Sequence, residues 1–309
     1  MNLSPPKENY YIPYNISNFY GASFLMSKIA KISHTNLMWR YWQHGWSCKH
    51  RQYDPELIAT EPLDQKWKIY VARKDEVDIL AKFGYKSKAI SLPFAYAFKY
   101  FDNFDRKENS LLFMPQHGNH DIGVNLGSKS KKFIEELADS EFNKNKRLFV
   151  SLHGDDLSSS RKFYEKLGFR VVLGAAINDL NSLLRMKYFF QTFEYVATNS
   201  VGSHIPYASL CGAKISLLDD SETTSNYKNN PFFSKRVPPP NLIKYYPFLI
   251  NSIENAREHK NWAKQQLGFE NILTPQEIKK EFGWHLSGRL TKRTYFFLSK
   301  LKRNLLTKK

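Results

Sequence analysis

The chain has 309 residues and a formal net charge of +17, from 46 Lys and Arg against 29 Asp and Glu. With 42% hydrophobic and 15% aromatic residues it has the composition of a large globular protein, which excludes disordered, fibrous and minidomain classes. Its two cysteines, Cys48 and Cys211, exclude a disulfide framework and indicate a reducing compartment. The charge predicts an anionic partner: nucleic acid, an anionic membrane face or a phosphorylated substrate.

The first hundred residues predict a smaller α/β lobe. Helices are expected at residues 22–32 and 76–83, and strands at 37–42, 69–72 and 89–92. A polar, charged linker follows at 102–109. Residues 1–14 hold no unbroken apolar run, and no window reaches about 18 uncharged apolar residues, so neither a signal peptide nor a membrane-spanning helix is expected.

From residue 109 onward, short apolar runs alternate with helical patterns. Strands are expected at 111–114, 148–152, 171–173, 195–197 and 215–218. The helices expected between them lie at 131–137, from a cap at 158–160 to Gly168, from Asn178 to 193, and at 205–210. This alternation predicts βαβ units and a parallel sheet. Helices at 253–266 and 275–282 follow a polar segment. The expected domains are residues 1–105, 106–230 and 231–309.

The loop after the strand at 111–114 carries a cluster of polar residues. These are Gln116, His117, His120 and Asp121, with Gly118 and Gly123 among them. Ligands of α/β proteins bind at the carboxyl ends of parallel strands, so we predict substrate-binding side chains here, with Asp121 as a candidate catalytic residue. The alternative is a polar loop that caps its own helix. Too few ligands accompany the two histidines for a defined metal site.

A second polar loop follows the strand at 195–197 and precedes a short helix. Its small and hydroxyl residues predict an anion site, because backbone N–H groups converge at a helix start. The candidate ligands are Asn199, Ser200, Gly202, Ser203 and His204. The alternative is that one of these residues only caps the helix. Neither a Gly-x-Gly-x-x-Gly motif nor a P-loop occurs.

Two further candidates lie at strand ends. Asp155 follows the strand at 148–152 and is a candidate substrate ligand, or a helix N-terminal charge that favours the helix dipole. His44 closes the strand at 37–42, between two tryptophans, and is the candidate general base because imidazole titrates near neutral pH. The alternative is a structural histidine.

Three motifs are considered together: Trp42-Gln43-His44-Gly45-Trp46, Ala197-Thr198-Asn199-Ser200-Val201-Gly202-Ser203-His204 and Ala208-Ser209-Leu210-Cys211-Gly212-Ala213-Lys214-Ile215. They resemble the GT-B glycosyltransferases of bacterial surface polysaccharides, and the likeness covers about residues 35–220. These enzymes include sialyl- and Kdo-type transferases and CDP-glycerol glycerophosphotransferases. The resemblance implies two Rossmann-like lobes facing a cleft, a nucleotide-sugar donor on the second lobe and an acceptor over the first. The chain departs from many retaining enzymes in having no acidic residue between Glu194 and Asp219.

The expected activity is therefore sugar transfer from a nucleotide-activated donor to a surface polysaccharide or lipopolysaccharide acceptor. No Asp-x-Asp motif occurs, so we expect metal-independent transfer and no cofactor. The alternatives are a phosphopolyol transferase with a CDP-activated donor and a basic nucleic-acid-binding or assembly protein. Nucleic acid is not the expected partner, because no RNA-binding signature occurs and the cations concentrate in the tail.

After Glu281 the chain carries cations interleaved with apolar residues and no acidic residue. Residues 286–309 therefore predict a basic amphipathic tail on an anionic membrane surface, where a lipid-linked glycan acceptor would be found. The alternative is a basic helix that packs on its own protein. The expected location is cytoplasmic, on the inner face of the cell membrane.

Overall fold

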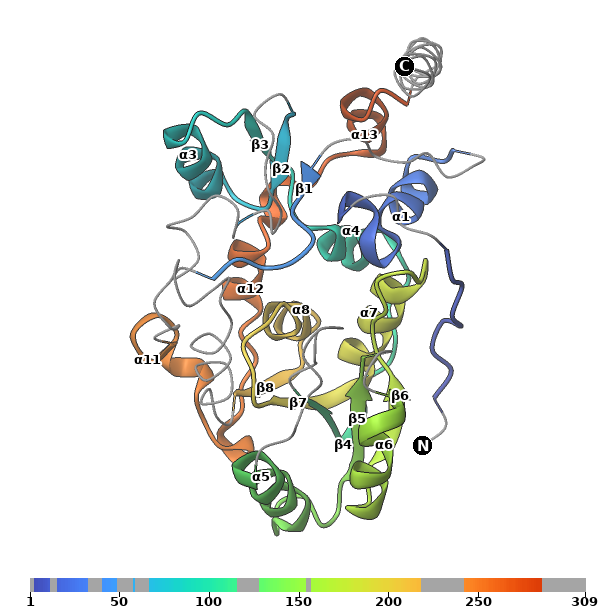
Figure 1. Cartoon of the computed structure of the whole chain (residues 1–309), viewed down its shortest axis with the longest axis vertical. Helices are drawn as coiled ribbons and strands as arrows, with labels where there is room; N and C mark the ends of the chain where they lie inside the picture. The colour runs from blue at the N-terminus through green and yellow to red at the C-terminus, as the bar shows by residue number, and fades with distance from the viewer. Residues whose placement is uncertain are drawn as a thin grey trace, which may run out of the picture.

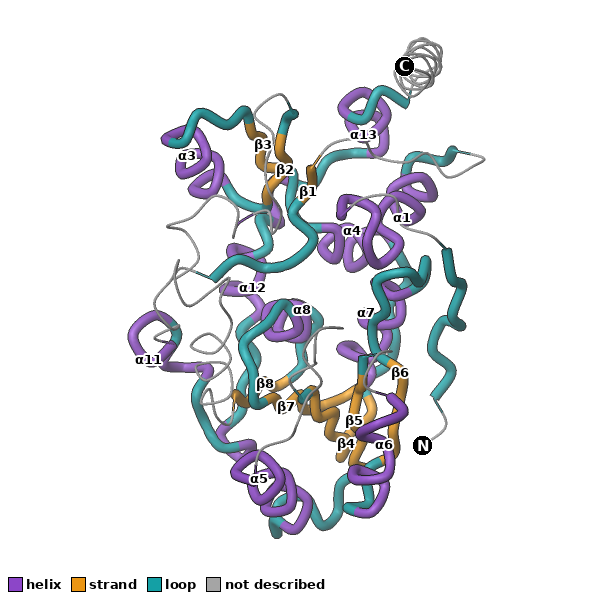
Figure 2. Tube along the Cα trace, in the orientation of Figure 1, coloured by secondary structure: helices purple, strands orange, loops and turns teal. Residues whose placement is uncertain are grey.

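The computed structural model describes residues 3–11, 16–32, 41–48, 58, 67–115, 128–153, 157–217 and 242–284. Within them the chain is a mixed α/β protein with two parallel sheets, of three and five strands. The sheets lie toward opposite ends of the molecule, and helices α4, α7, α8 and α12 lie between them (Figures 1 and 2). One cluster of buried side chains reaches from Trp42 and Tyr70 of the smaller sheet to Leu112 and Val196 of the larger. The two sheets therefore share a continuous core.

The smaller sheet follows the predicted pattern. Its strands are β1 (Tyr41–Trp42), β2 (Ile69–Val71) and β3 (Ser87–Ala89), paired in parallel in that order. Helix α3 (Lys74–Lys82) connects β2 to β3 and ends before Gly84, whose φ of 78° is the left-handed conformation that glycine adopts without strain. The strand expected at 89–92 is displaced, because β3 already ends at Ala89.

Three helical elements accompany this sheet. They are η1 (Ile16–Gly21), α1 (Ala22–Ile29) and α4 (Pro93–Tyr100). The sequence pattern predicts α1 but not α4. Residues Pro93 to Ala97 of α4 are all buried, so the helix has too little polar surface in this stretch to show a helical period.

The larger sheet confirms the predicted alternation. Its strands are β4 (Lys107–Met114), β5 (Arg147–Leu152), β6 (Arg170–Leu173), β7 (Phe193–Thr198) and β8 (Lys214–Leu217), all parallel. The connecting helices are α5 (Ser128–Asp139), α6 (Leu157–Lys166), α7 (Ser182–Thr192) and α8 (His204–Leu210). The strand order β6-β5-β4-β7-β8 runs outward in both directions from β4. This is the doubly wound, Rossmann-like order, and its topological switch point lies between β4 and β7.

Both faces of the larger sheet are buried. Along β4, Leu111 and Phe113 face one cluster with Ile134 of α5 and Tyr164 of α6, while Leu112 faces the core shared with the smaller sheet. Successive side chains of a strand point to opposite faces, so this alternation places helices on both sides. The larger sheet is therefore the middle layer of three.

Two predicted helices have different bounds. Helix α7 begins at Ser182 and not near Asn178, because the chain first turns where Asp179 accepts a hydrogen bond from the Asn181 N–H (3.0 Å) and pairs with Arg185 (2.6 Å). The helix expected at 253–266 is broken into η5 (Ile253–Asn255) and α12 (Lys260–Gln266). Between them Arg257 forms a bridge to Ile215 at the edge of β8, which requires extended backbone.

Segments at both ends of the described chain tie the layers together. Tyr10 pairs with Asp179 before α7, on the larger-sheet side. The C-terminal part comprises α11 (Leu242–Tyr245), η4 (Pro247–Leu249), η5, α12, η6 (Phe269–Asn271) and α13 (Pro275–Glu281). Gly268, with φ of 62°, packs so closely on the Ala72 carbonyl oxygen that a Cβ there would lie 1.8 Å from it. No helix among the described residues is long and apolar enough to cross a bilayer. The predicted tail, residues 286–309, lies outside them.

Glu281 of α13 joins the C-terminal region to the smaller sheet. Its carboxylate accepts hydrogen bonds from Lys68 (2.7 Å), Tyr70 (2.9 Å) and Lys88. Burial alone would raise the pKa of Glu281, but these hydrogen bonds outweigh burial and lower its pKa from 4.5 to about 2. The folded state therefore holds its charged form more strongly than the unfolded state does.

We expect Glu281→Gln to destabilise the protein above pH 4.5 and to match the wild type as the pH falls toward 2. A lowered pKa in the folded state contributes stability that is lost when the carboxylate is protonated. The loss near neutral pH should be about 1 kcal/mol, because the lysine partners are partly exposed. Urea unfolding at pH 7, 5, 4 and 3 measures it, with Glu135→Gln on the exposed surface of α5 as the control. A constant difference at all pH values would contradict this assignment.

Candidate functional site

The loop after β1 and the loop after β7 meet between the two sheets. The backbone N–H of Trp46 donates to the Ser203 hydroxyl at 2.8 Å, and the Tyr207 hydroxyl donates to the His44 carbonyl at 3.2 Å. A Cβ at Gly45 would lie 2.7 Å from the Ser203 oxygen, so glycine permits this approach. The structure thus brings two separately predicted motifs into direct contact.

Two hydrogen bonds hold this contact. Trp46 donates to Ser203, and Tyr207 donates to the His44 carbonyl. Burial raises the pKa of Tyr207, with a further rise from nearby Tyr20 and an opposing effect of the nearby Ser203 side chain. Tyr207 is therefore a protonated donor at neutral pH. Ser203, predicted as a substrate ligand, here holds the His44 loop.

His44 lies half-buried beside two aromatic rings. Its ring centroid is 5.8 Å from that of Phe19 and 6.0 Å from that of Tyr20. Tyr20 has a left-handed backbone with φ of 59°, and Gly21 follows with φ of 78°. A non-glycine residue in this region is strained, so the surrounding packing must hold Tyr20 beside His44.

A buried polar network holds the His44 loop from the smaller-sheet side. Gln43 donates to the Glu76 carboxylate (3.1 Å) and accepts from the Ala72 N–H (2.8 Å). Arg73 pairs with Glu76 (3.0 Å) and donates to the Ser47 carbonyl (3.3 Å). Burial raises the pKa of Glu76, and the neighbouring Arg73 opposes that rise. The network therefore fixes both ends of the loop.

Thr198 ends β7 at the switch point of the larger sheet. Its hydroxyl lies 2.7 Å from the Met114 carbonyl of β4, 3.1 Å from the Ser200 N–H and 2.9 Å from His204 Nε2. A hydroxyl has one proton, and two oxygens 2.7 Å apart need that proton between them. Thr198 therefore donates to Met114, whose carbonyl is nearer than that of Ser200 (3.2 Å), and accepts from the Ser200 N–H and His204 Nε2.

This arrangement sets the tautomer of His204. Because Thr198 accepts from Nε2, the neutral ring carries its proton on Nε2 and its lone pair on Nδ1. The ring also packs on Gly202, where a Cβ would lie 2.8 Å from Nδ1. Gly202 thus contributes through its lack of a side chain, and His204 has a fixed orientation at the switch point.

Asn199 and Ser200 complete this loop and are both buried, with exposed fractions of 2% and 6%. The other predicted site residues lie outside the described part of the chain: Gln116, His117, His120, Asp121 and Asp155. The first four follow β4, whose last residue, Met114, pairs with Thr198. Their roles stay predictions. No group of three His, Cys, Asp or Glu side chains suited to a metal ion occurs among the described residues.

Sequence reasoning did not single out three residues that shape the site. Thr198 lies within one of the quoted motifs, but its hydroxyl can bind the Met114 carbonyl only because β4 pairs with β7. Tyr207 follows His204 by three residues, so helical spacing places both toward one side. Tyr20 gives no sequence signal beyond its place before a glycine.

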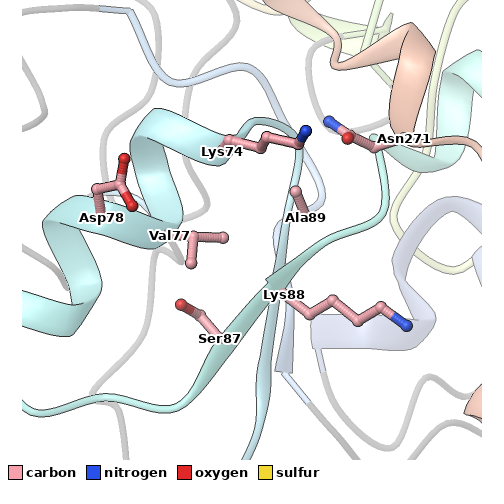
Figure 3. A pocket seen from close by; sticks show the side chains of 7 residues that line it. All are labelled: Lys74, Val77, Asp78, Ser87, Lys88, Ala89 and Asn271. Carbon is pink, nitrogen blue, oxygen red and sulfur yellow. The ribbon is translucent and has the colours of Figure 1, made fainter.

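A surface depression of about 430 Å³ lies between α3 and β3, and Figure 3 shows the side chains that line it. Seven residues line it: Lys74, Val77, Asp78, Ser87, Lys88, Ala89 and Asn271. Two of its polar groups are already engaged, since Lys88 pairs with Glu281 and the Asn271 amide donates to Ala72 and Glu270. None of the predicted site residues lines it, so the loop contact remains the candidate site.

Comparison with known protein families finds no family model that matches the chain. Comparison with curated proteins likewise finds none of similar sequence.

We expect Thr198→Val to let the neutral His204 ring carry its proton on either nitrogen, and Thr198→Ser to keep the proton on Nε2. Valine has the shape of threonine but cannot accept the Nε2 proton, whereas serine can. Ring nitrogen shifts of histidine-labelled protein, recorded by NMR at neutral pH, report the tautomer. Thr198→Val should also cost about 1–3 kcal/mol, because it removes a partner from buried groups. A wild-type ring protonated on Nδ1 alone would show that the hydrogen-bond directions are wrong.

Proposed function

We propose that this protein is a glycosyltransferase that uses a nucleotide-activated sugar donor. One observation carries the proposal: the loop at the topological switch point of the larger sheet touches the loop that carries His44. Doubly wound sheets bind nucleotides outside the carboxyl ends of their strands at the switch point. A base for the acceptor hydroxyl would then lie next to the donor.

The proposed chemistry assigns a role to each loop. Asn199, Ser200 and the backbone after Thr198 hold the donor phosphate. His44 takes the proton of the acceptor hydroxyl as its oxygen attacks the anomeric carbon, and the bond to the donor phosphate breaks. The nucleoside phosphate leaves with the bonding electron pair, stabilised by N–H donors and cations.

Support for this assignment comes from the way the loops are held. The His44 loop is fixed from both sheets, by Glu76 and Arg73 on one side and by Ser203 and Tyr207 on the other. Catalysis by positioning requires such fixed geometry. The same arrangement would serve transfer of a phosphopolyol from a CDP-activated donor, which is a separate outcome of the nucleotide experiment. The proposed acceptor is a surface glycan linked to lipid, with the basic tail on the membrane.

The protein should select one nucleotide from a panel of UDP, CDP, GDP, ADP, TDP and CMP in isothermal titration calorimetry. Ser200→Ala should weaken that binding by about 2- to 12-fold, the loss expected for one neutral hydrogen bond. Ser209→Ala is the matched control, because Ser209 is a buried serine of α8 beyond the loop. Selection of CDP, with release of CMP from a CDP-activated polyol donor, would favour the phosphopolyol reaction. Failure to bind any nucleotide would overturn the proposed function.

His44→Ala should lower turnover of the selected donor by about a hundredfold or more, the scale of a lost general base. Nucleotide affinity should change little, because His44 belongs to the acceptor side. The measurement is release of nucleoside phosphate at saturating donor, with His44→Gln as a variant of similar size. If turnover survives while nucleotide binding collapses, His44 belongs to the donor site instead.

A further inference from the structure

Five aromatic rings lie in contact beside the His44 loop. We call them the aromatic cluster: Trp46, Tyr246, Phe248, His259 and Trp262. Trp46 comes from the loop itself, Tyr246 and Phe248 from the segment after α11, and the other two from the start of α12. The cluster therefore joins the candidate site to the C-terminal region.

The cluster leads from the site to the surface. Trp46 is 3% exposed, and its ring centroid lies 5.7 Å from that of Trp262. Trp262 lies 5.5 Å from Phe248, and Phe248 is 40% exposed. A ligand on Phe248 would thus be linked through the Trp262 ring to Trp46, whose backbone N–H binds Ser203.

Two ring nitrogens of the cluster have no hydrogen-bond partner among the residues that the structure describes. They are Nε1 of Trp262 and Nε2 of His259, and both atoms are buried. Both rings border Phe248, with centroids 5.5 Å and 4.7 Å from its own. A buried polar group without a partner is costly, so such groups usually mark a water or a ligand.

The ring nitrogen at the site end of the cluster has a partner. The ring N–H of Trp46 donates to the Gln266 side chain at 3.1 Å. Burial lowers the pKa of His259, so its ring is neutral at pH 7 and has one donor and one acceptor nitrogen. The orphaned nitrogens are therefore concentrated at the exposed end, around Phe248.

We propose that the aromatic cluster binds the saccharide acceptor, with a pyranose ring against Phe248 and sugar hydroxyls paired with Trp262 Nε1 and His259 Nε2. A sugar hydroxyl both donates and accepts, so the hydroxyls of one saccharide can satisfy an indole donor and a neutral imidazole. The apolar C–H face of the sugar covers the exposed ring. This inference rests on the proposed function for its acceptor role, but saccharide binding itself is a separate property.

The probes are maltotetraose, cellotetraose, chitotetraose and mannotetraose at millimolar concentration, observed by saturation-transfer NMR with the full chain. The wild type should bind at least one of them. Phe248→Ser should weaken that binding by about tenfold, the loss typical when an aromatic contact residue is truncated. Trp262→Phe keeps the stacked ring but removes the N–H, and should weaken binding by about 2- to 12-fold.

Phe83→Ser is the matched control, because Phe83 is 45% exposed at the end of α3, away from the cluster. It should bind as the wild type does. Absence of binding to all four probes, equal binding by Phe248→Ser, or a preference for a single-stranded oligonucleotide overturns the inference. Nucleotide selection without saccharide binding overturns only this inference, whereas saccharide binding without nucleotide binding overturns only the proposed function.

Discussion

The site depends on one constraint: a six-residue loop, 43–48, is held from both sheets at once. On one side Glu76 and Arg73 bind its two ends through Gln43 and the Ser47 carbonyl. On the other side α8 binds its centre through the hydroxyls of Ser203 and Tyr207. Without the hydrogen bonds from α8, nothing among these contacts would fix His44 relative to the switch point of the larger sheet.

Stability alone does not explain a charged pair at this position. Glu76 is fully buried and Arg73 is 8% exposed, and taking both groups out of water offsets much of their attraction. The pair instead specifies the conformation of the loop. Gln43, the Arg73 N–H and the Arg73 guanidinium all bind the same carboxylate, so only one loop conformation satisfies every donor. An apolar pair of the same volume would fill the space without specifying that conformation.

The sequence predicts local structure here better than it predicts the site. Short continuous apolar runs predicted the five strands of the larger sheet, because its central strands have two buried faces. Helix α4 was not predicted because its buried stretch shows no helical period, and the start of α7 was displaced by the turn in which Asp179 binds Asn181 and Arg185. Of the site, the His44 and Asn199–His204 motifs were found from strand ends. The contact between them joins residues more than 150 positions apart, which no local pattern encodes.

Ser203 shows how the two halves of the site are coupled. Its hydroxyl accepts from the Trp46 N–H and contacts Tyr207, while its backbone lies in the loop that begins at the switch point. A phosphate bound at that loop would therefore act on the group that positions His44. By the reciprocity of linked equilibria, the packing of Trp46 in the aromatic cluster would act on the phosphate in turn. Donor and acceptor sides would then be coupled through the hydrogen bonds of Ser203 and Tyr207, so substitution of Ser203 alone would not assign it to either side.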